Sequence, residues 1–163
     1  MHPDRKEIRL RNYDYSSPGA YFITICSHNR ECTFGSIMPG SVFQESTVCL
    51  SALGKIIECN IDRIPQVYPN VQIEKSVIMP NHLHLLMAVT KATDSNGKSL
   101  NKMLVPRVIQ SFKASVSRQA RAQKPVWQNR FHDHIVRDEQ EFLRIWTYID
   151  NNPALWQDDC YFL

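Results

Sequence analysis

Apolar and polar positions along the chain predict a mixture of strands and helices. Runs of β-branched and aromatic residues bounded by turn signals predict three strands, at 20–27, 71–79 and 82–90. A tight turn at Pro80 and Asn81 joins the second of these strands to the third. Short apolar runs on either side of Pro39 and Gly40 predict an additional hairpin within 34–43.

Helical periodicity appears in three other segments. The first has its apolar face at Leu53, Ile56, Ile57, Ile61 and Ile64, and Ser51 is its candidate N-cap. We expect Pro65 to end it. A longer helix is predicted at roughly 99–122, where Pro106 either begins or kinks the helix. Its buried stripe contains Val105, Val108, Ile109, Phe112 and Val116.

A last helix is predicted after Asp138, a good N-cap followed by acidic residues that suit a helix N-terminus. Its apolar face contains Phe142, Ile145, Trp146 and Ile149, and Asn152 with Pro153 ends it. The segment before it, 124–137, leads into a short final strand.

The predicted order is strand, hairpin, helix, strand, strand, helix, strand, helix. With the hairpin as an insertion, this order predicts an α+β, ferredoxin-like βαββαβ sandwich. Its antiparallel sheet has helices on one face, and the last helix is added at the C-terminus. We expect one domain over residues 1–163, with a basic N-terminal arm at 1–19.

Composition places the chain among ordinary globular proteins, with 43% hydrophobic and 21% charged residues and a net charge of +3. No apolar run approaches the roughly 18 residues that suggest a membrane span, and the charged N-terminus lacks a signal-peptide core. The five cysteines form no Cys-x-x-Cys pair, which favours reduced thiols. These features predict a cytoplasmic protein with no membrane partner.

Two histidines follow the Pro80–Asn81 turn in a strand that alternates between the faces of a sheet. His82 and His84 therefore share one face, with Leu83 on the other. Such a pair is a good start to a metal site, although two solvated or hydrogen-bonded histidines would give the same pattern.

The flank of the last helix carries a phenol and an amide that project together, because Asn152 follows Tyr148 by one turn. If this helix packs against the histidine strand, the Asn152 oxygen completes a mixed N/O site for Mg²⁺ or Mn²⁺. Tyr148 then suits covalent attack on a phosphodiester, with a metal polarising the phosphate. The alternative is a half-buried aromatic at a helix edge.

Basic residues gather in two places. Arg107, Arg118 and Arg121 lie on one stripe of the 99–122 helix, which suits either solvation or phosphate binding. Residues 5–11, which include Arg9 and Arg11, form either a solvated tail or an arm that touches phosphates.

The chain resembles the REP-associated tyrosine transposases, which are relatives of single-tyrosine HUH transposases. The segments that carry the resemblance are Val77–Leu86, with its His-hydrophobic-His motif, and Tyr148–Pro153. Supporting stretches are 8–15, 19–25, 111–113, 126–128 and 131–137. The resemblance extends over roughly 8–157 in the expected order.

The resemblance implies a divalent metal held by His82, His84 and a third ligand four residues after the catalytic tyrosine, here Asn152. It also implies that Tyr148 cuts single-stranded DNA, commonly hairpins of palindromic repeats, and leaves a 5′-phosphotyrosine and a free 3′-hydroxyl. A histidine matching His134 is typical of the family, and we expect it to support the site or contact DNA. We expect a structural role for His132, because the charged Asp133 between the two histidines fits the motif poorly.

The resulting prediction is a metal-dependent single-strand DNA endonuclease and strand transferase, nucleoid-associated when bound to DNA. Arg107, Lys113, Arg118, Arg121, Arg9 and Arg11 are the candidate DNA contacts. The oligomeric state is a monomer or a homodimer. The alternatives are a catalytically inactive, domesticated nucleic-acid-binding module and a small ferredoxin-like ligand-binding protein.

Overall fold

A four-stranded antiparallel sheet in the order β4-β5-β1-β6 is the centre of the computed structural model, which describes residues 18–40, 45–90 and 103–162. Its strands are β1 (Gly19–Cys26), β4 (Val71–Ile78), β5 (His82–Val89) and β6 (His132–Val136). β1 and β4 lie on either side of β5, which is the split arrangement of a ferredoxin-like sheet. The predicted α+β fold is confirmed.

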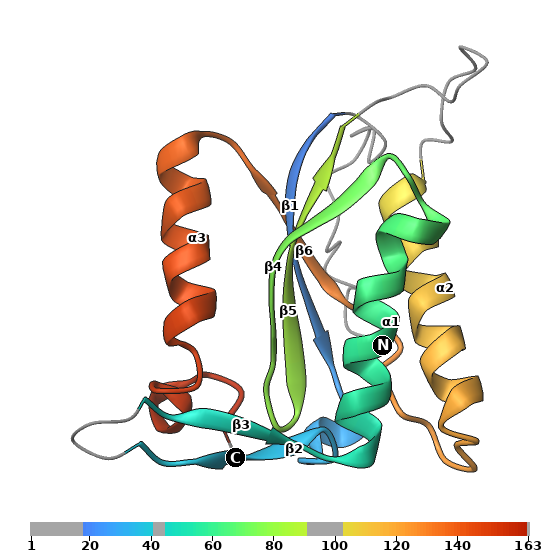
Figure 1. The fold of residues 1–163 in the computed structure, drawn as a ribbon, viewed down its shortest axis with the longest axis vertical. Coiled ribbons are helices and arrows are strands. Elements are labelled where there is room, and N and C mark those ends of the chain that lie inside the picture. Colours follow the sequence, from blue (N-terminus) through green and yellow to red (C-terminus); the bar gives the residue numbers. More distant parts are fainter. Residues whose placement is uncertain (1–17, 41–44, 91–102, 163) are drawn as a thin grey trace, which may run out of the picture.

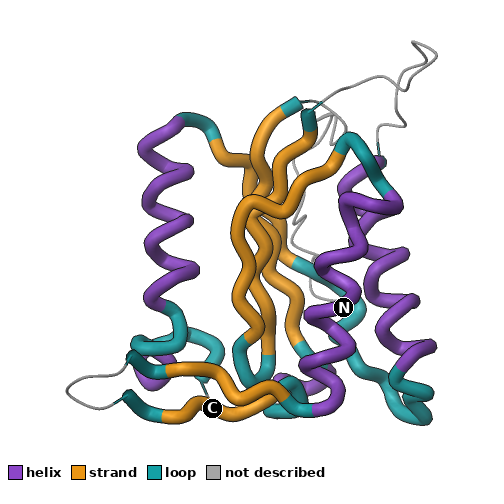
Figure 2. The backbone as a smooth tube through the Cα atoms, in the orientation of Figure 1, coloured by secondary structure: helices purple, strands orange, loops and turns teal. Residues whose placement is uncertain are grey.

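Helices cover both faces of this sheet (Figure 1). α1 (Ala52–Val67) and α2 (Leu104–Gln119) pack side by side on one face, and α3 (Glu139–Asn151) lies on the other (Figure 2). The two faces follow from alternation along β1, where Tyr21, Ile23 and Ile25 are fully buried in the core cluster with residues of α1 and α2. The other face of the sheet is left for α3 and the polar side chains.

The inserted hairpin is present, but its second strand comes later than predicted. β2 (Gly35–Met38) pairs with β3 (Thr47–Leu50), whereas the sequence suggested a return within 41–43. Pro39 and Gly40 leave β2 as expected, while residues 41–44 lie outside the described residues. The return strand is instead Thr47–Leu50, which contains β-branched and apolar residues and directly precedes Ser51, the N-cap of α1.

Two helix ends also differ from the prediction. Pro65 lies inside α1, which continues to Val67. Pro65 cannot donate to the Ile61 carbonyl, but the helix continues past it, and the Tyr68 N–H bonds to the Ile64 carbonyl. α2 ends at Gln119, earlier than the predicted 122, because Arg121 takes a positive φ. It begins at Leu104 after Met103, with Pro106 in its first turn, and residues 99–102 of the predicted helix lie outside the described residues.

The predicted helix caps of α1 and α3 are confirmed. Ser51 Oγ accepts a hydrogen bond from the Gly54 N–H at 3.0 Å, and Asp138 Oδ1 accepts one from the Glu141 N–H at 2.8 Å. The remaining short elements are the 3₁₀ turns η1 (His28–Arg30) and η2 (Trp156–Asp158). The five cysteines are unpaired. No helix among the described residues has both the length and the apolar character needed to cross a membrane.

Candidate active site

His82 and His84 lie on the face of β5 that α3 covers, with their Nε2 atoms 3.1 Å apart. Both imidazoles are buried, and His82 is completely shielded from solvent. Two neighbouring ligands of an octahedral cation with bonds of about 2.1 Å lie about 3 Å apart. The separation of the two nitrogens therefore suits a shared cation.

The hydrogen bonds of Asn81 determine which nitrogen of His82 carries the proton. The Asn81 Nδ2 donates to the carbonyls of Arg30 and Tyr161, at 3.2 and 2.8 Å. Its Oδ1 is therefore the acceptor that faces His82 Nδ1 at 2.9 Å, so His82 Nδ1 is the protonated nitrogen. The neutral ring then directs an unprotonated Nε2 into the site.

Thr24 of β1 provides the corresponding contact for His84. Its Oγ1 lies 2.8 Å from His84 Nδ1, and a hydroxyl can donate or accept. His84 can therefore place its proton on Nε2, facing His82, or on Nδ1, which leaves two unprotonated Nε2 atoms together. A cation between these atoms favours the second arrangement, because it removes the repulsion between their lone pairs.

Tyr148 reaches the histidines from α3, with its Oη 3.4 Å from His84 Nε2. The phenol ring packs against the His84 ring at 5.3 Å and edge-on against Phe22 at 6.1 Å. Phe22 also stacks on His84, at 5.0 Å. The structure thus brings together the tyrosine and the histidine strand within one chain, and Tyr148 keeps 38% of its surface exposed.

Asn152, one turn after Tyr148, is only 1% exposed. Its Nδ2 donates to Asp159 Oδ2 at 2.9 Å, while its Oδ1 is buried without a hydrogen-bond partner. The Asn152 side chain acts to raise the pKa of His82, because a carbonyl oxygen beside the ring favours the protonated imidazole. A buried carbonyl oxygen without a donor, next to an unprotonated nitrogen, is the environment that a cation would satisfy.

Asp159 adds a carboxylate that the sequence analysis did not identify. Donor atoms of His82, His84 and Asp159 lie within 4.8 Å of one another, which makes these residues a possible metal-binding trio. With the Asn152 oxygen, the donors are two nitrogens and two oxygens, and such a set fits a divalent cation.

Burial sets the protonation states of the site. It lowers the pKa of His82 to about 4 and that of His84 well below its usual value, where the neighbouring His82 charge adds to the effect. Both imidazoles are therefore neutral at pH 7, as metal binding requires. Burial, with the Asp159 charge as the next cause, raises the pKa of Tyr148 to about 12, so the phenol is protonated without a cation.

Several residues of this cluster were missed from the sequence, namely Thr24, Phe22, Asn81, Trp156, Asp159 and Tyr161. The sequence predicts only a turn at Asn81, whereas in the structure its side chain is completely buried. Alternation along β1 could have placed Thr24 on the histidine face, but the register with β5 was unknown. The segment after Asn152 has no periodicity, so its return to the site had no sequence signal.

The predicted DNA contacts of α2 lie on the other side of the sheet. Arg107 and Arg118 are exposed on this helix, and Arg121 follows its end with a positive φ of 49°. Lys113 instead donates to the carbonyls of Gln128 and Asn129, at 2.6 and 3.4 Å. The sheet separates α2, which carries Arg107 and Arg118, from α3 and the histidine face (Figure 1). Arg9 and Arg11 lie outside the described residues.

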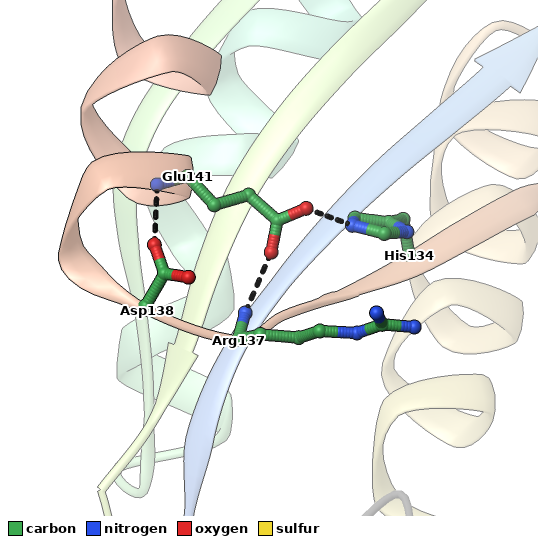
Figure 3. Close-up of polar contacts among 4 residues, drawn as sticks. All are labelled: His134, Arg137, Asp138 and Glu141. Atoms are coloured by element: carbon green, nitrogen blue, oxygen red, sulfur yellow. Dashed lines mark hydrogen bonds and ion pairs between the residues drawn. The ribbon is translucent and has the colours of Figure 1, made fainter.

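His134 lies in β6 and contacts Glu141 in the first turn of α3 (Figure 3). Its Nε2 is 2.7 Å from Glu141 Oε1, while Glu141 Oε2 accepts from the Arg137 N–H, also at 2.7 Å. These bonds fasten the end of β6 to the first turn of α3. His132 is exposed opposite Thr24 in the register.

The chain matches no protein-family profile. It is similar to an uncharacterized protein of Haemophilus influenzae, 37% identical over 95% of this chain and 91% of that protein. It is also 29% identical to a second protein of that organism, named "Putative REP-associated tyrosine transposase", over 47% of this chain and 46% of the relative.

Two solved structures have a similar fold. One is a REP-associated tyrosine transposase bound to a REP hairpin, with a TM-score of 0.63, 18% identity, and coverage of 90% of this chain and 72% of that one. The other, from Deinococcus radiodurans, is described as a "putative transposase", with a TM-score of 0.50, 14% identity, and coverage of 88% and 95%.

The two solved structures therefore share the fold of this chain, in which helices pack on an antiparallel sheet. The chain belongs to one family with the 37% identical Haemophilus protein, and its resemblance to the REP-associated tyrosine transposases is confirmed.

Proposed function

We propose that this protein is a metal-dependent single-strand DNA endonuclease and strand transferase that acts through a covalent 5′-phosphotyrosine on Tyr148. The observation that carries the proposal is the 3.4 Å separation of Tyr148 Oη from His84 Nε2 at a buried, neutral histidine pair. A phenol at such a site, on a transposase-like fold, suits attack on a phosphodiester.

His82, His84 and Asn152 would hold the divalent cation, Mg²⁺ or Mn²⁺. Bound there, the cation supplies positive charge that polarises the phosphate and favours the tyrosinate. Asn81 and Thr24 orient the two imidazoles through their Nδ1 atoms. Phe22 packs against Tyr148 and keeps the phenol beside His84.

In the proposed reaction the Tyr148 oxygen forms a bond to phosphorus, and the bond from phosphorus to the 3′ oxygen breaks. The phenol releases one proton, and the departing 3′ oxygen takes one up as a hydroxyl, so the step is balanced. Because a phosphodiester replaces a phosphodiester, a 3′-hydroxyl can reverse the attack and rejoin strands without an external energy source.

We propose hairpin-forming repeat DNA as the partner, since the solved relative is bound to a REP hairpin. The exposed Arg107, Arg118 and Arg121 would contact phosphates of DNA that extends around the sheet edge. Lys113 is the least suited of the proposed contacts, because its ammonium group already donates to two carbonyls.

Tyrosine and histidines of one chain are in contact, which supports cleavage in cis by a monomer. The test is incubation of the protein with single-stranded hairpin DNA and Mn²⁺, followed by denaturing electrophoresis. We expect a covalent adduct with wild type and with Tyr68→Phe, whose phenol lies at the end of α1, and none with Tyr148→Phe.

Chelator and His82→Ala should each abolish the adduct. A Tyr148→Phe adduct at the wild-type level would rule out the proposed nucleophile. Hairpin binding that is unchanged by Tyr148→Phe, with no adduct under any metal, would instead favour the inactive nucleic-acid-binding module.

A further inference from the structure

The segment after α3 turns back across the histidine pair. This C-terminal segment, residues 153–162, contains η2 and Asp159. The Tyr161 ring lies 4.5 Å from the His82 ring, and the Trp156 ring lies 6.0 Å from it. Asn81 Nδ2 donates to the Tyr161 carbonyl at 2.8 Å, so the segment is fastened to the turn that precedes His82.

We infer that Asp159 is a fourth ligand of the proposed cation, so that cation binding fastens the C-terminal segment over the histidines. The inference rests on the proposed metal site and concerns a residue outside the set of His82, His84 and Asn152. Its basis is the position of the Asp159 carboxylate, whose donor atom lies within 4.8 Å of both imidazole donors.

Charge favours this role for Asp159. A coordinating imidazole or amide carbonyl carries no charge, so the buried His82, His84 and Asn152 would leave the two charges of the cation uncompensated. Burying a charge is costly unless an opposite charge accompanies it. A carboxylate is also the oxygen ligand that Mg²⁺ and Mn²⁺ prefer.

Hydrogen bonds hold the carboxylate in place before any cation arrives. Asp159 Oδ1 accepts from the Tyr161 N–H at 2.8 Å, and Oδ2 accepts from Asn152 Nδ2 at 2.9 Å. Tyr148 Oη is a third, longer donor at 3.5 Å. Each carboxylate oxygen has further lone pairs, so these bonds do not exclude coordination.

The rival explanation is that Asp159 serves only as a hydrogen-bond acceptor for Asn152 and Tyr148. The two explanations differ in what a cation does to the segment. A ligand couples cation binding to the position of residues 153–162, whereas an acceptor alone leaves the segment equally ordered with and without the cation.

The test measures Mn²⁺ binding by calorimetry or electron paramagnetic resonance, and hydrogen exchange of residues 153–162 with and without Mn²⁺. We expect Asp159→Asn to weaken Mn²⁺ affinity at least 10-fold and to remove the Mn²⁺-dependent protection of the segment. Asp158→Asn is the matched control, because Asp158 is the residue directly before Asp159 and its carboxylate is exposed. It should retain both properties.

His82→Ala separates this inference from the proposed function. Loss of Mn²⁺ binding in His82→Ala, with affinity and protection unchanged in Asp159→Asn, would overturn the fourth ligand and leave the metal site standing. If wild type itself does not bind Mn²⁺, both fail.

Discussion

Asn81 connects three parts of the site through one amide group. It orients His82, donates to the Arg30 carbonyl at the end of η1 and anchors Tyr161. The sequence gives a turn at this position and the histidines after it, because turn residues and alternation are local signals. The hydrogen bond from Asn81 to Tyr161 joins residues 80 positions apart, and no local sequence pattern encodes such a contact.

We predict that Asn81→Asp destabilises the fold by about 2–4 kcal/mol, because the partly buried carbonyls of Arg30 and Tyr161 lose their donor and face a carboxylate. Hydrogen exchange at residues 153–162 should also accelerate. Urea unfolding checks the free energy, and Asn129→Asp, at an exposed position, is the control. Equal stability of the two variants would contradict the assignment of the Asn81 amide.

The lowered pKa values of His82 and His84 predict how the free energy of unfolding depends on pH. The folded state lowers the pKa of His82 from 6.5 to about 4, so the unfolded chain binds more protons between these values. Stability is therefore fully present above about pH 6.5 and is lost as pH falls towards 4. Burial also lowers the pKa of His84 well below its usual value, which adds to the same loss.

The expected loss from His82 in the metal-free protein is on the order of 3 kcal/mol. Urea unfolding at pH 7 and pH 4.5 measures it. His82→Gln should flatten the difference, whereas His132→Gln, at an exposed position, should not. A pH dependence that survives in His82→Gln unchanged would show that other groups cause it.

At the scale of elements, α3 is held on the sheet at both ends. Near its start, Glu141 joins His134 and the Arg137 N–H. Further along, the Lys75 ammonium pairs with Asp150 and lies 4.8 Å from the Trp146 ring. The sequence predicted the helix, its cap and its apolar face, but the face of the sheet that it covers follows from contacts with β4 and β6.

Asp138→Ala should destabilise the protein by about 1 kcal/mol, because the Glu141 N–H loses its capping acceptor. Gln140→Ala, at an exposed position of the same turn, is the control and should change stability little. The measurement is the urea midpoint. A midpoint for Asp138→Ala equal to that of wild type would mean that the cap contributes nothing to α3.

At the scale of the whole molecule, the sheet separates the arginines of α2 from the histidines. Helical periodicity predicted one stripe with Arg107, Arg118 and Arg121; Arg107 and Arg118 are exposed on α2, whereas Arg121 lies beyond its last residue, Gln119. Periodicity could not predict which face of the sheet α2 covers, because it describes one helix and not the position of that helix on a sheet. DNA held at the site would therefore reach Arg107 and Arg118 only by passing around the molecule.

Arg107→Gln and Arg118→Gln should each weaken hairpin binding and reduce the salt slope by about 1 for each lost phosphate contact. Cleavage of saturating DNA in a single turnover should be unchanged, because neither side chain reaches Tyr148. Lys55→Gln, on exposed α1 surface, is the charge control. Fluorescence anisotropy at several salt concentrations gives the slope, and equal slopes in all variants would exclude these contacts.

The two halves of the site are far apart in the order of synthesis. His84 leaves the ribosome 75 residues before Asp159, with α2, β6 and α3 between them. At about 5–20 residues per second, the histidine strand waits on the order of 4–15 s for its tyrosine and carboxylate. A chain interrupted in this interval has the histidines but lacks Tyr148 and Asp159, so unfinished copies would lack the proposed nucleophile.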